Sequence, residues 1–255
     1  MKVDGLLGSR VISGELPTPT DLARRVDPAE YARLLAYPQR RIPAGRAWRR
    51  AAQSREWYER DGRPWAFATT IAIDSATDTE IRLTNGELLS SEVLARRLRQ
   101  AEAGALVAAA ISAGSAVDER SQGLWQEGRP DEAYFLDRFA AAVVEHLASW
   151  VGRHLREMAR HHGLALLPGT SPGYDGWDLE QQTRVARCLT GGGAAPPTRS
   201  FEVLASGMIR PKSSLLTVFG LTPRVEPAEA AWRRQPCSWC SLTACGFRRV
   251  QIAVG

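Results

Sequence analysis

The residues best suited to ligand chemistry lie in a loop of glycines and prolines that spans residues 169–182 and reads "GTSPGYDGWDLEQQ". The loop leads into a helix predicted to begin at Asp178, so free backbone N–H groups and a positive dipole end face an anion. Tyr174 and Trp177 offer rings that stack on a planar ligand. This combination suits a carboxylate-bearing adenine nucleotide such as S-adenosylmethionine, and a rigid turn packed by its own aromatic side chains is the open alternative.

The same loop contains the pattern G-x-S-x-G, which is typical of serine hydrolases, at residues 169–173. In those enzymes the residue after the serine donates its backbone N–H to the oxyanion, and Pro172 has no N–H. The hydrolase families also place their histidine after the serine, whereas the last histidine here is His162. The sequence therefore argues against a hydrolase.

Three of the four cysteines cluster near the C-terminus as Cys237, Cys240 and Cys245, in a C-x2-C-x4-C pattern. Thiols at this spacing can converge on one metal ion, with Cys188 or a histidine as a fourth ligand. Zinc and an iron–sulfur cluster both fit the pattern. A redox dithiol and inert buried thiols are the alternatives that the spacing leaves open.

The four histidines lie in or just after a long predicted helix. Only His146 and His154 share a helix face, and their separation is too large for two ligands of one ion. We therefore interpret all four as helix-surface or helix-end residues. No pair of carboxylates stands out as an acid and base couple.

The composition is that of an ordinary globular protein, with 255 residues, 44% hydrophobic and 24% charged residues, and a net charge of +5. The arginines occur as scattered pairs without interleaved aromatic residues, which disfavours nucleic acid and favours an acidic protein partner. The longest apolar run, residues 104–114, is too short to span a membrane. With no signal peptide in the opening residues, we expect a cytoplasmic protein.

Apolar periodicity predicts both helices and strands around this loop. Helical spacing marks residues 27–37, 46–62, 90–102 and 131–162. Alternation or short apolar runs predict strands at residues 64–73, 79–87, 104–114, 200–208, 213–221 and 247–254. We therefore expect an α+β fold in which helices pack on a modest mixed or antiparallel sheet. Residues 1–27 are predicted to form an irregular arm, and residues 28–255 a single domain with a cysteine-bearing C-terminal segment.

The segment "SPGYDGWDLEQQ" resembles the loop of the activation domain of cobalamin-dependent methionine synthase, in which an arginine precedes a Gly-Tyr pair that holds S-adenosylmethionine. Further resemblances to that family occur, in the same order, at residues 27–38, 123–151 and 206–221. The last of these, "SGMIRPKSSLLTVFGL", is similar to a strand pair beside the ligand loop. The resemblance implies a binding site made of Ser171, Pro172, Gly173, Tyr174, Trp177, Arg210 and Lys212.

The family resemblance also implies a function. The activation domain docks on a cobalamin-bearing domain and presents S-adenosylmethionine, while an external one-electron reductant allows the methyl group to return to cobalt. By this resemblance, the chain is an accessory protein for reductive activation or methylation of cobalamin on a partner corrinoid protein or split methionine synthase. It would be one component of a cobalamin-dependent methyltransferase system in methionine biosynthesis.

Two features depart from the family or limit the comparison. Gly169 occupies the position of the family's arginine, which removes the bidentate partner of a ligand carboxylate, and Arg184 and Arg210 are the candidates to replace it. A cobalamin-ligating D-x-H-x-x-G motif is missing, so we expect the corrinoid to arrive on a partner. The alternative hypothesis is a redox or metal module that docks on a corrinoid protein without S-adenosylmethionine, and a purely structural docking subunit is a third.

Overall fold

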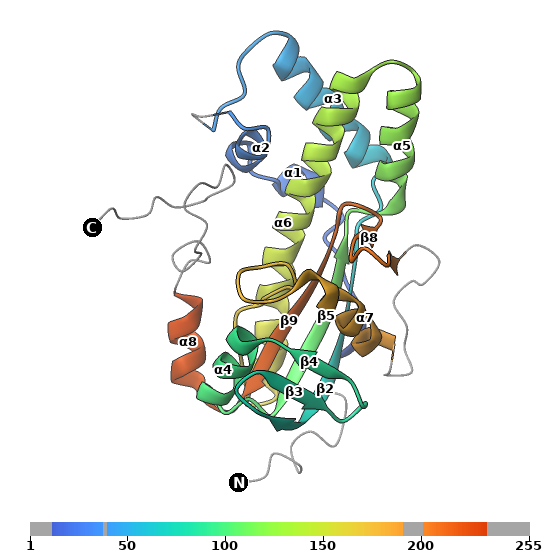
Figure 1. Cartoon of the computed structure of the whole chain (residues 1–255). Helices are drawn as coiled ribbons and strands as arrows, with labels where there is room; N and C mark the ends of the chain where they lie inside the picture. The colour runs from blue at the N-terminus through green and yellow to red at the C-terminus, as the bar shows by residue number, and fades with distance from the viewer. Residues whose placement is uncertain (1–11, 38–39, 191–200, 234–255) are drawn as a thin grey trace, which may run out of the picture.

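A computed structural model describes residues 12–37, 40–190 and 201–233 of the chain. Its centre is a curled antiparallel sheet with helices against both faces (Figure 1). The largest helix runs beside the central strands for their full length, and smaller helices cover the opposite face. This arrangement confirms the predicted α+β fold.

Seven strands of the described residues form the main sheet in the order β4-β3-β2-β5-β9-β6, with β1 also paired to β2, and every pairing is antiparallel. A separate hairpin consists of β7 and β8. The strands are β1 (Ser13–Leu16), β2 (Trp65–Ala76), β3 (Glu80–Leu83), β4 (Leu88–Ser90), β5 (Ala105–Ser112), β6 (Ala165–Leu166), β7 (Glu202–Val203), β8 (Ile209–Arg210) and β9 (Ser214–Thr222).

The central strand β5 explains how the sheet holds helices on both faces. All eight of its residues are buried. Val107 and Ile111 point into one core, whereas Leu106 and Ala108 point into the other, as the two-residue period of a strand requires. The alanines in this strand are small enough for close approach from either side. A continuous apolar run, with no polar face, is the sequence signature of such a strand.

The first face of the sheet packs against a layer of helices built around α6. This layer comprises α1 (Leu22–Arg25), α2 (Pro28–Leu34), α3 (Arg46–Asp61), α5 (Ser115–Gln126) and α6 (Pro130–His161). The opposite face carries α4 (Glu92–Gln100), the 3-10 turn η2 (Leu179–Gln181) and α7 (Gln182–Thr190). The last described helix, α8 (Val225–Trp232), lies beside β6, where Trp232 Nε1 donates a hydrogen bond to the Leu166 carbonyl at 2.6 Å.

The helix α6 buries a stripe of residues at steps of three and four, among them Phe139, Val143 and Leu147, each fully buried. Pro130 occupies its first turn, where a missing N–H costs nothing. Tyr31 and Tyr58 pack edge-on against Phe139 at ring distances of 5.0 and 5.7 Å. These contacts fasten α2 and α3 to the central helix.

The N-terminal segment differs from the sequence-based expectation. The sequence predicts an irregular arm over residues 1–27, yet β1 and α1 lie within it, and Ile12, Leu16 and Leu22 are buried in the first core. The domain boundary at residue 27 stays a prediction. Within the described residues, no helix is both long and apolar enough to cross a membrane.

Candidate functional site

The loop that carries the predicted ligand residues leaves β6 and runs along β9. The Leu167 N–H donates to the Gly220 carbonyl at 2.8 Å, and Thr170 and Val218 exchange two backbone hydrogen bonds of 2.8 and 3.0 Å. These bonds hold the start of the loop against the middle of β9. The loop then ends in η2 and α7, close to the predicted helix start at Asp178.

Backbone hydrogen bonds close the loop on itself between residues 171 and 177. The N–H of Gly173 donates to the Trp177 carbonyl at 2.8 Å, that of Tyr174 to the Ser171 carbonyl at 3.2 Å, and that of Trp177 to the Tyr174 carbonyl at 3.0 Å. The N–H of Gly173 is therefore engaged within the turn. An anion at this loop would need donors other than the Gly173 N–H.

Three of the predicted site residues lie inside the loop. Ser171 and Trp177 are 2% and 4% exposed, and Pro172 is also buried. Trp177 belongs to the core on the α4 side of the sheet, and its Nε1 has no hydrogen-bond partner among the described residues. Packing against α4 fixes this arrangement, because a Cβ on Gly176 would lie 2.4 Å from Val93 Cγ2. Trp177 therefore packs inside the turn and does not face a ligand. This agrees with the alternative that the sequence left open, a rigid turn packed by its own aromatic side chains.

The outward side of the loop presents Gly173 and Tyr174. Gly173 has φ +88°, a conformation that favours glycine, and Tyr174 is 54% exposed. A Cβ on Gly173 would lie 3.0 Å from Leu179 Cδ1, and one on Gly207 would lie 3.1 Å from Leu179 Cγ. Leu179 therefore joins the loop to the β7–β8 hairpin. The exposed residues around this contact, which we call the loop surface, are Gly173, Tyr174, Leu179 and Met208, and the buried Gly207 lies beneath Leu179.

The two predicted basic residues of the site occupy different surroundings. Arg210 lies in β8, three residues after Gly207, and is exposed, with no ion pair or hydrogen bond found for its side chain among the described residues. Lys212 Nζ instead lies 2.8 Å from Asp137 Oδ1 and donates to Ser121 Oγ at 3.1 Å. Its interactions tie the start of β9 to α5 and α6, so the structure does not direct Lys212 to the loop surface.

Gly169, at the position of the family's arginine, packs closely on β9. A Cβ at this position would lie 2.8 Å from both Phe219 Cε1 and Thr217 Oγ1, closer than real Cβ contacts. An arginine here would therefore require the side chains of Phe219 and Thr217, or the loop itself, to move. Of the two candidate replacements, Arg184 on α7 lies 3.7 Å from Glu87, whereas Arg210 keeps its guanidinium unpaired among the described residues.

The predicted metal ligands Cys237, Cys240 and Cys245 lie outside the described residues. Cys188, their proposed fourth partner, is 2% exposed in the core on α7, and burial together with nearby Glu87 raises the pKa of its thiol to about 12. Within the described ranges, no group of three histidines, cysteines or carboxylates lies close enough to hold a metal ion. The metal centre stays a prediction.

Sequence reasoning missed the apolar part of the loop surface. Leu179 and Met208 are 39% and 56% exposed, and neither is adjacent to the Gly-Tyr pair in the sequence. The available signal was a glycine before Met208, because Gly207 adopts φ +80° and brings the hairpin against Leu179. Pairing of a turn glycine with a distant leucine is visible only in three dimensions.

The fold is that of an α+β protein in which one long helix and a curled antiparallel sheet carry an aromatic, glycine-containing loop. No protein-family model and no curated protein matches the sequence. Among solved structures, the chain is similar to the crystal structure of the MetH reactivation domain bound to AdoHcy (S-adenosylhomocysteine), with a TM-score of 0.61 and 12% sequence identity. The alignment covers 87% of this chain and 83% of that chain. At this identity the similarity establishes the fold: the chain has the fold of the MetH reactivation domain.

Proposed function

We propose that this chain binds S-adenosylmethionine at the loop surface and assists the reductive activation or methylation of cobalamin carried by a partner protein. The supporting observation is the fold match to a reactivation domain that was solved with AdoHcy, over 87% of the chain. The segment that resembles the family's ligand loop exposes Gly173 and Tyr174 on its outward side. The proposal thus combines a shared architecture with a locally suitable surface.

The residues at the loop surface fit part of this ligand. Tyr174 presents an exposed ring for an adenine base. Leu179, which lies next to Gly173 and Gly207, and Met208 add exposed apolar area. Gly173 has no side chain to keep a ligand from the backbone. When bound, S-adenosylmethionine would supply the methyl group, and the chain would supply binding and alignment.

The carboxylate of the ligand needs a cation that Gly169 cannot provide. We assign this role to Arg210, which follows the hairpin turn that packs on Leu179 and has no side-chain partner among the described residues. A guanidinium binds a carboxylate through two parallel hydrogen bonds. Arg210 on β8 would therefore bind the ligand carboxylate in the way that the family's arginine does from the position of Gly169. Ser171, Pro172 and Trp177 would support the loop from within, and Lys212 would fasten β9.

The partner in this proposal is a corrinoid-binding protein or a split methionine synthase subunit, together with an electron donor. The sequence has no D-x-H-x-x-G motif, which supports delivery of cobalamin by the partner. The single domain of residues 28–255 would dock as one unit, with the cysteine-bearing segment attached.

Thermal unfolding with and without ligand tests the binding step. A ligand that binds only the folded chain raises Tm, and at a concentration 100 times Kd it adds about 2.7 kcal/mol of stability. S-adenosylmethionine should raise Tm for the wild type but not for Tyr174→Ala. Tyr134→Ala, which removes a tyrosine that is also exposed but lies on α6, is the matched control and should keep the shift. An equal shift for Tyr174→Ala would refute the assigned surface.

A second candidate function is a redox or metal module that docks on a corrinoid protein without S-adenosylmethionine. The close packing of Gly169 on Thr217 and Phe219 favours it, because it removes the family's anchor for the ligand carboxylate. The cysteines at 237, 240 and 245 would then bind zinc or an iron–sulfur cluster. Iron, zinc and sulfide measured after anaerobic purification distinguish this candidate, since a metal-free protein would contradict it.

A further inference from the structure

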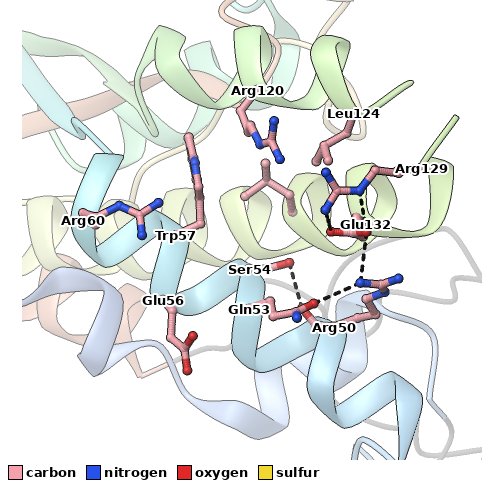
Figure 2. Close-up of a pocket in the computed structure, with 11 residues that line it drawn as sticks. Arg50, Gln53, Ser54, Glu56, Trp57, Arg60, Arg120, Leu124, Arg129 and Glu132 are labelled. Carbon is pink, nitrogen blue, oxygen red and sulfur yellow. Dashed lines mark hydrogen bonds and ion pairs between the residues drawn. The ribbon is translucent and has the colours of Figure 1, made fainter. Parts of the chain in front are cut away.

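The groove between α3 and α5 is lined by charged side chains that pair with one another (Figure 2). Glu132 lies 3.0 Å from Arg50 and 2.6 Å from Arg129. Glu127 lies 3.1 Å from Arg120 and 2.6 Å from Arg129. These pairs engage the charges of the groove within the protein, so they do not point to a ligand.

The β7–β8 hairpin differs, because it places two opposite charges side by side without pairing them. Glu202 lies directly opposite Arg210 in the hairpin register, and both side chains are exposed. Neither side chain has an ion pair or a hydrogen bond within the described part of the chain. Side chains that lie directly opposite each other in an antiparallel pair have Cβ atoms about 4.5–5.5 Å apart. An acid and a base are therefore neighbours at a distance that leaves room for a small group between them.

The alternation of side chains along the two strands sends both charges outward. Val203 and Ile209, the adjacent pair in the register, pack in the core on the α4 side of the sheet. Successive side chains of a strand point to opposite faces, so Glu202 and Arg210 point away from that core. The hairpin itself lies against α7 and β9, which fixes its outward side (Figure 1).

The same alternation connects the two charges to the loop surface. Met208 stands two residues before Arg210, and both are exposed on either side of the buried Ile209. Two residues of extended chain correspond to about 7 Å. Gly207, which precedes Met208, lies beneath Leu179. The outward side of the hairpin therefore continues the loop surface from its apolar part to a pair of opposite charges.

We propose that Glu202 and Arg210 together bind the amino acid end of S-adenosylmethionine, an inference that rests on the proposed function of the loop surface. Arg210 binds the carboxylate, and Glu202 binds the ammonium group. Both ligand groups are attached to one carbon atom, so their protein partners must also be neighbours, as the hairpin register makes these two residues. Glu202 is thus the residue that makes the site specific for a zwitterionic amino acid.

This specificity has an attractive and a repulsive part. A lone arginine would accept a phosphate as readily as a carboxylate, because both offer oxygens for two parallel hydrogen bonds. A carboxylate beside the arginine repels a phosphate and attracts an ammonium group, which separates S-adenosylmethionine from the adenine nucleotides. The pair is neutral as a whole, and so is the zwitterion that it binds.

A series of ligands tests the inference on the unmodified full chain. The probes are S-adenosylmethionine, its decarboxylated form, and the dimethylsulfonium analogue of adenosine, which keeps the base, the ribose and the positive sulfur but has no amino acid. Calorimetric titration should show binding that is about tenfold or more weaker for the decarboxylated ligand than for S-adenosylmethionine. The analogue without the amino acid should bind more weakly still.

Two variants assign each charge of the ligand to its partner. Glu202→Gln should weaken S-adenosylmethionine about tenfold or more and the decarboxylated ligand by a similar factor, because both carry the ammonium group. Arg210→Gln should weaken S-adenosylmethionine but not the decarboxylated ligand, and neither change should affect the analogue without the amino acid. Glu80→Gln is the matched control and should bind as the wild type, because it neutralises an exposed glutamate of β3 for which no ion pair is found among the described residues.

The competing explanation is that Glu202 acts only as a surface ion-pair partner of Arg210. Neutralising it would then release Arg210, and Glu202→Gln would bind S-adenosylmethionine as tightly as the wild type or more tightly. That result overturns the inference and leaves the proposed function standing, as does equal affinity of the wild type for all three ligands. An equal loss for the analogue without the amino acid also overturns it. If the wild type does not bind S-adenosylmethionine, the proposed function fails together with the inference.

Discussion

Replacing Gly169 with alanine would place a Cβ atom 2.8 Å from both Phe219 Cε1 and Thr217 Oγ1. Both neighbours lie in β9 near the centre of the sheet, and they are only 4% and 5% exposed. The φ angle of Gly169 is outside the left-handed region, so the backbone itself accepts an alanine. The expected penalty therefore comes from the steric contact alone.

The magnitude follows from two contributions. Forcing an extra carbon into a packed region costs about 1–3 kcal/mol. Relief by moving Thr217 would also weaken the 3.2 Å hydrogen bond from its Oγ1 to the Thr170 carbonyl, which is worth about 1 kcal/mol. We expect Gly169→Ala to lower the free energy of unfolding by about 2 kcal/mol. An arginine has the same Cβ and would face the same contact.

Urea denaturation of the wild type and the variant measures this effect, with an unchanged m-value as the sign that only stability has changed. Gly123→Ala on α5 is the matched control, because its nearest heavy atom would lie at an ordinary 3.9 Å. That control should gain about 0.4–1 kcal/mol, since alanine restricts the unfolded chain and favours the helix. The two glycine substitutions are therefore predicted to have opposite signs.

A double-mutant cycle with Phe219→Leu checks the assigned contact, because removal of the ring should reduce the cost of Gly169→Ala. The steric account would be refuted if Gly169→Ala were as stable as the wild type. It would also be refuted if the cost were the same with leucine at position 219. In either case the loop would have room for a side chain, and the family's arginine would be absent for a different reason.

Two further predictions concern buried groups. Because burial and Glu87 raise the pKa of the Cys188 thiol from 9.0 to about 12, Cys188 should stay unmodified by iodoacetamide at pH 8 in the native protein and react in urea, as read by peptide mass spectrometry. The stability that the protonated Cys188 thiol contributes is fully present below pH 9 and is lost as the pH rises toward 12. A urea midpoint that stays unchanged over that pH range would contradict this prediction. Tyr58→Phe should cost about 1–3 kcal/mol, since it leaves the buried Ala113 carbonyl, now 2.7 Å from Tyr58 Oη, unpaired. Tyr37→Phe, for which no hydroxyl hydrogen bond is found among the described residues, should cost little in the same urea titration and serves as its control.

The main elements of the fold were predictable because their patterns are strong. The continuous apolar run of β5 and the helical spacing of buried residues in α6 each extend over the whole element. The helix α5 was missed because only Val117, Ser121 and Leu124 of its twelve residues are buried. The strand predicted at residues 200–208 contains only the two residues of β7.

The candidate site was predictable only in part. The Gly-Tyr pair identified the loop, but the sequence could not show which aromatic residue turns inward. That choice depends on Gly176 packing against Val93 and on its carbonyl accepting a hydrogen bond from Ser91 Oγ at 3.1 Å, both from a distant helix. The separation of Arg210 from Lys212 also depends on long-range contacts, because Asp137 on α6 holds the lysine.

Calorimetric titration of the purified chain with S-adenosylmethionine tests the central claim most directly. We predict one binding site in the wild type and no measurable heat in Gly173→Val, where a branched side chain would cover the backbone at φ +88° and meet Leu179. Gly163→Val introduces the same strain at φ +68° in open space at the end of α6, and it should bind as the wild type. Absence of binding to the wild type, or undiminished affinity in Gly173→Val, would contradict the proposed site.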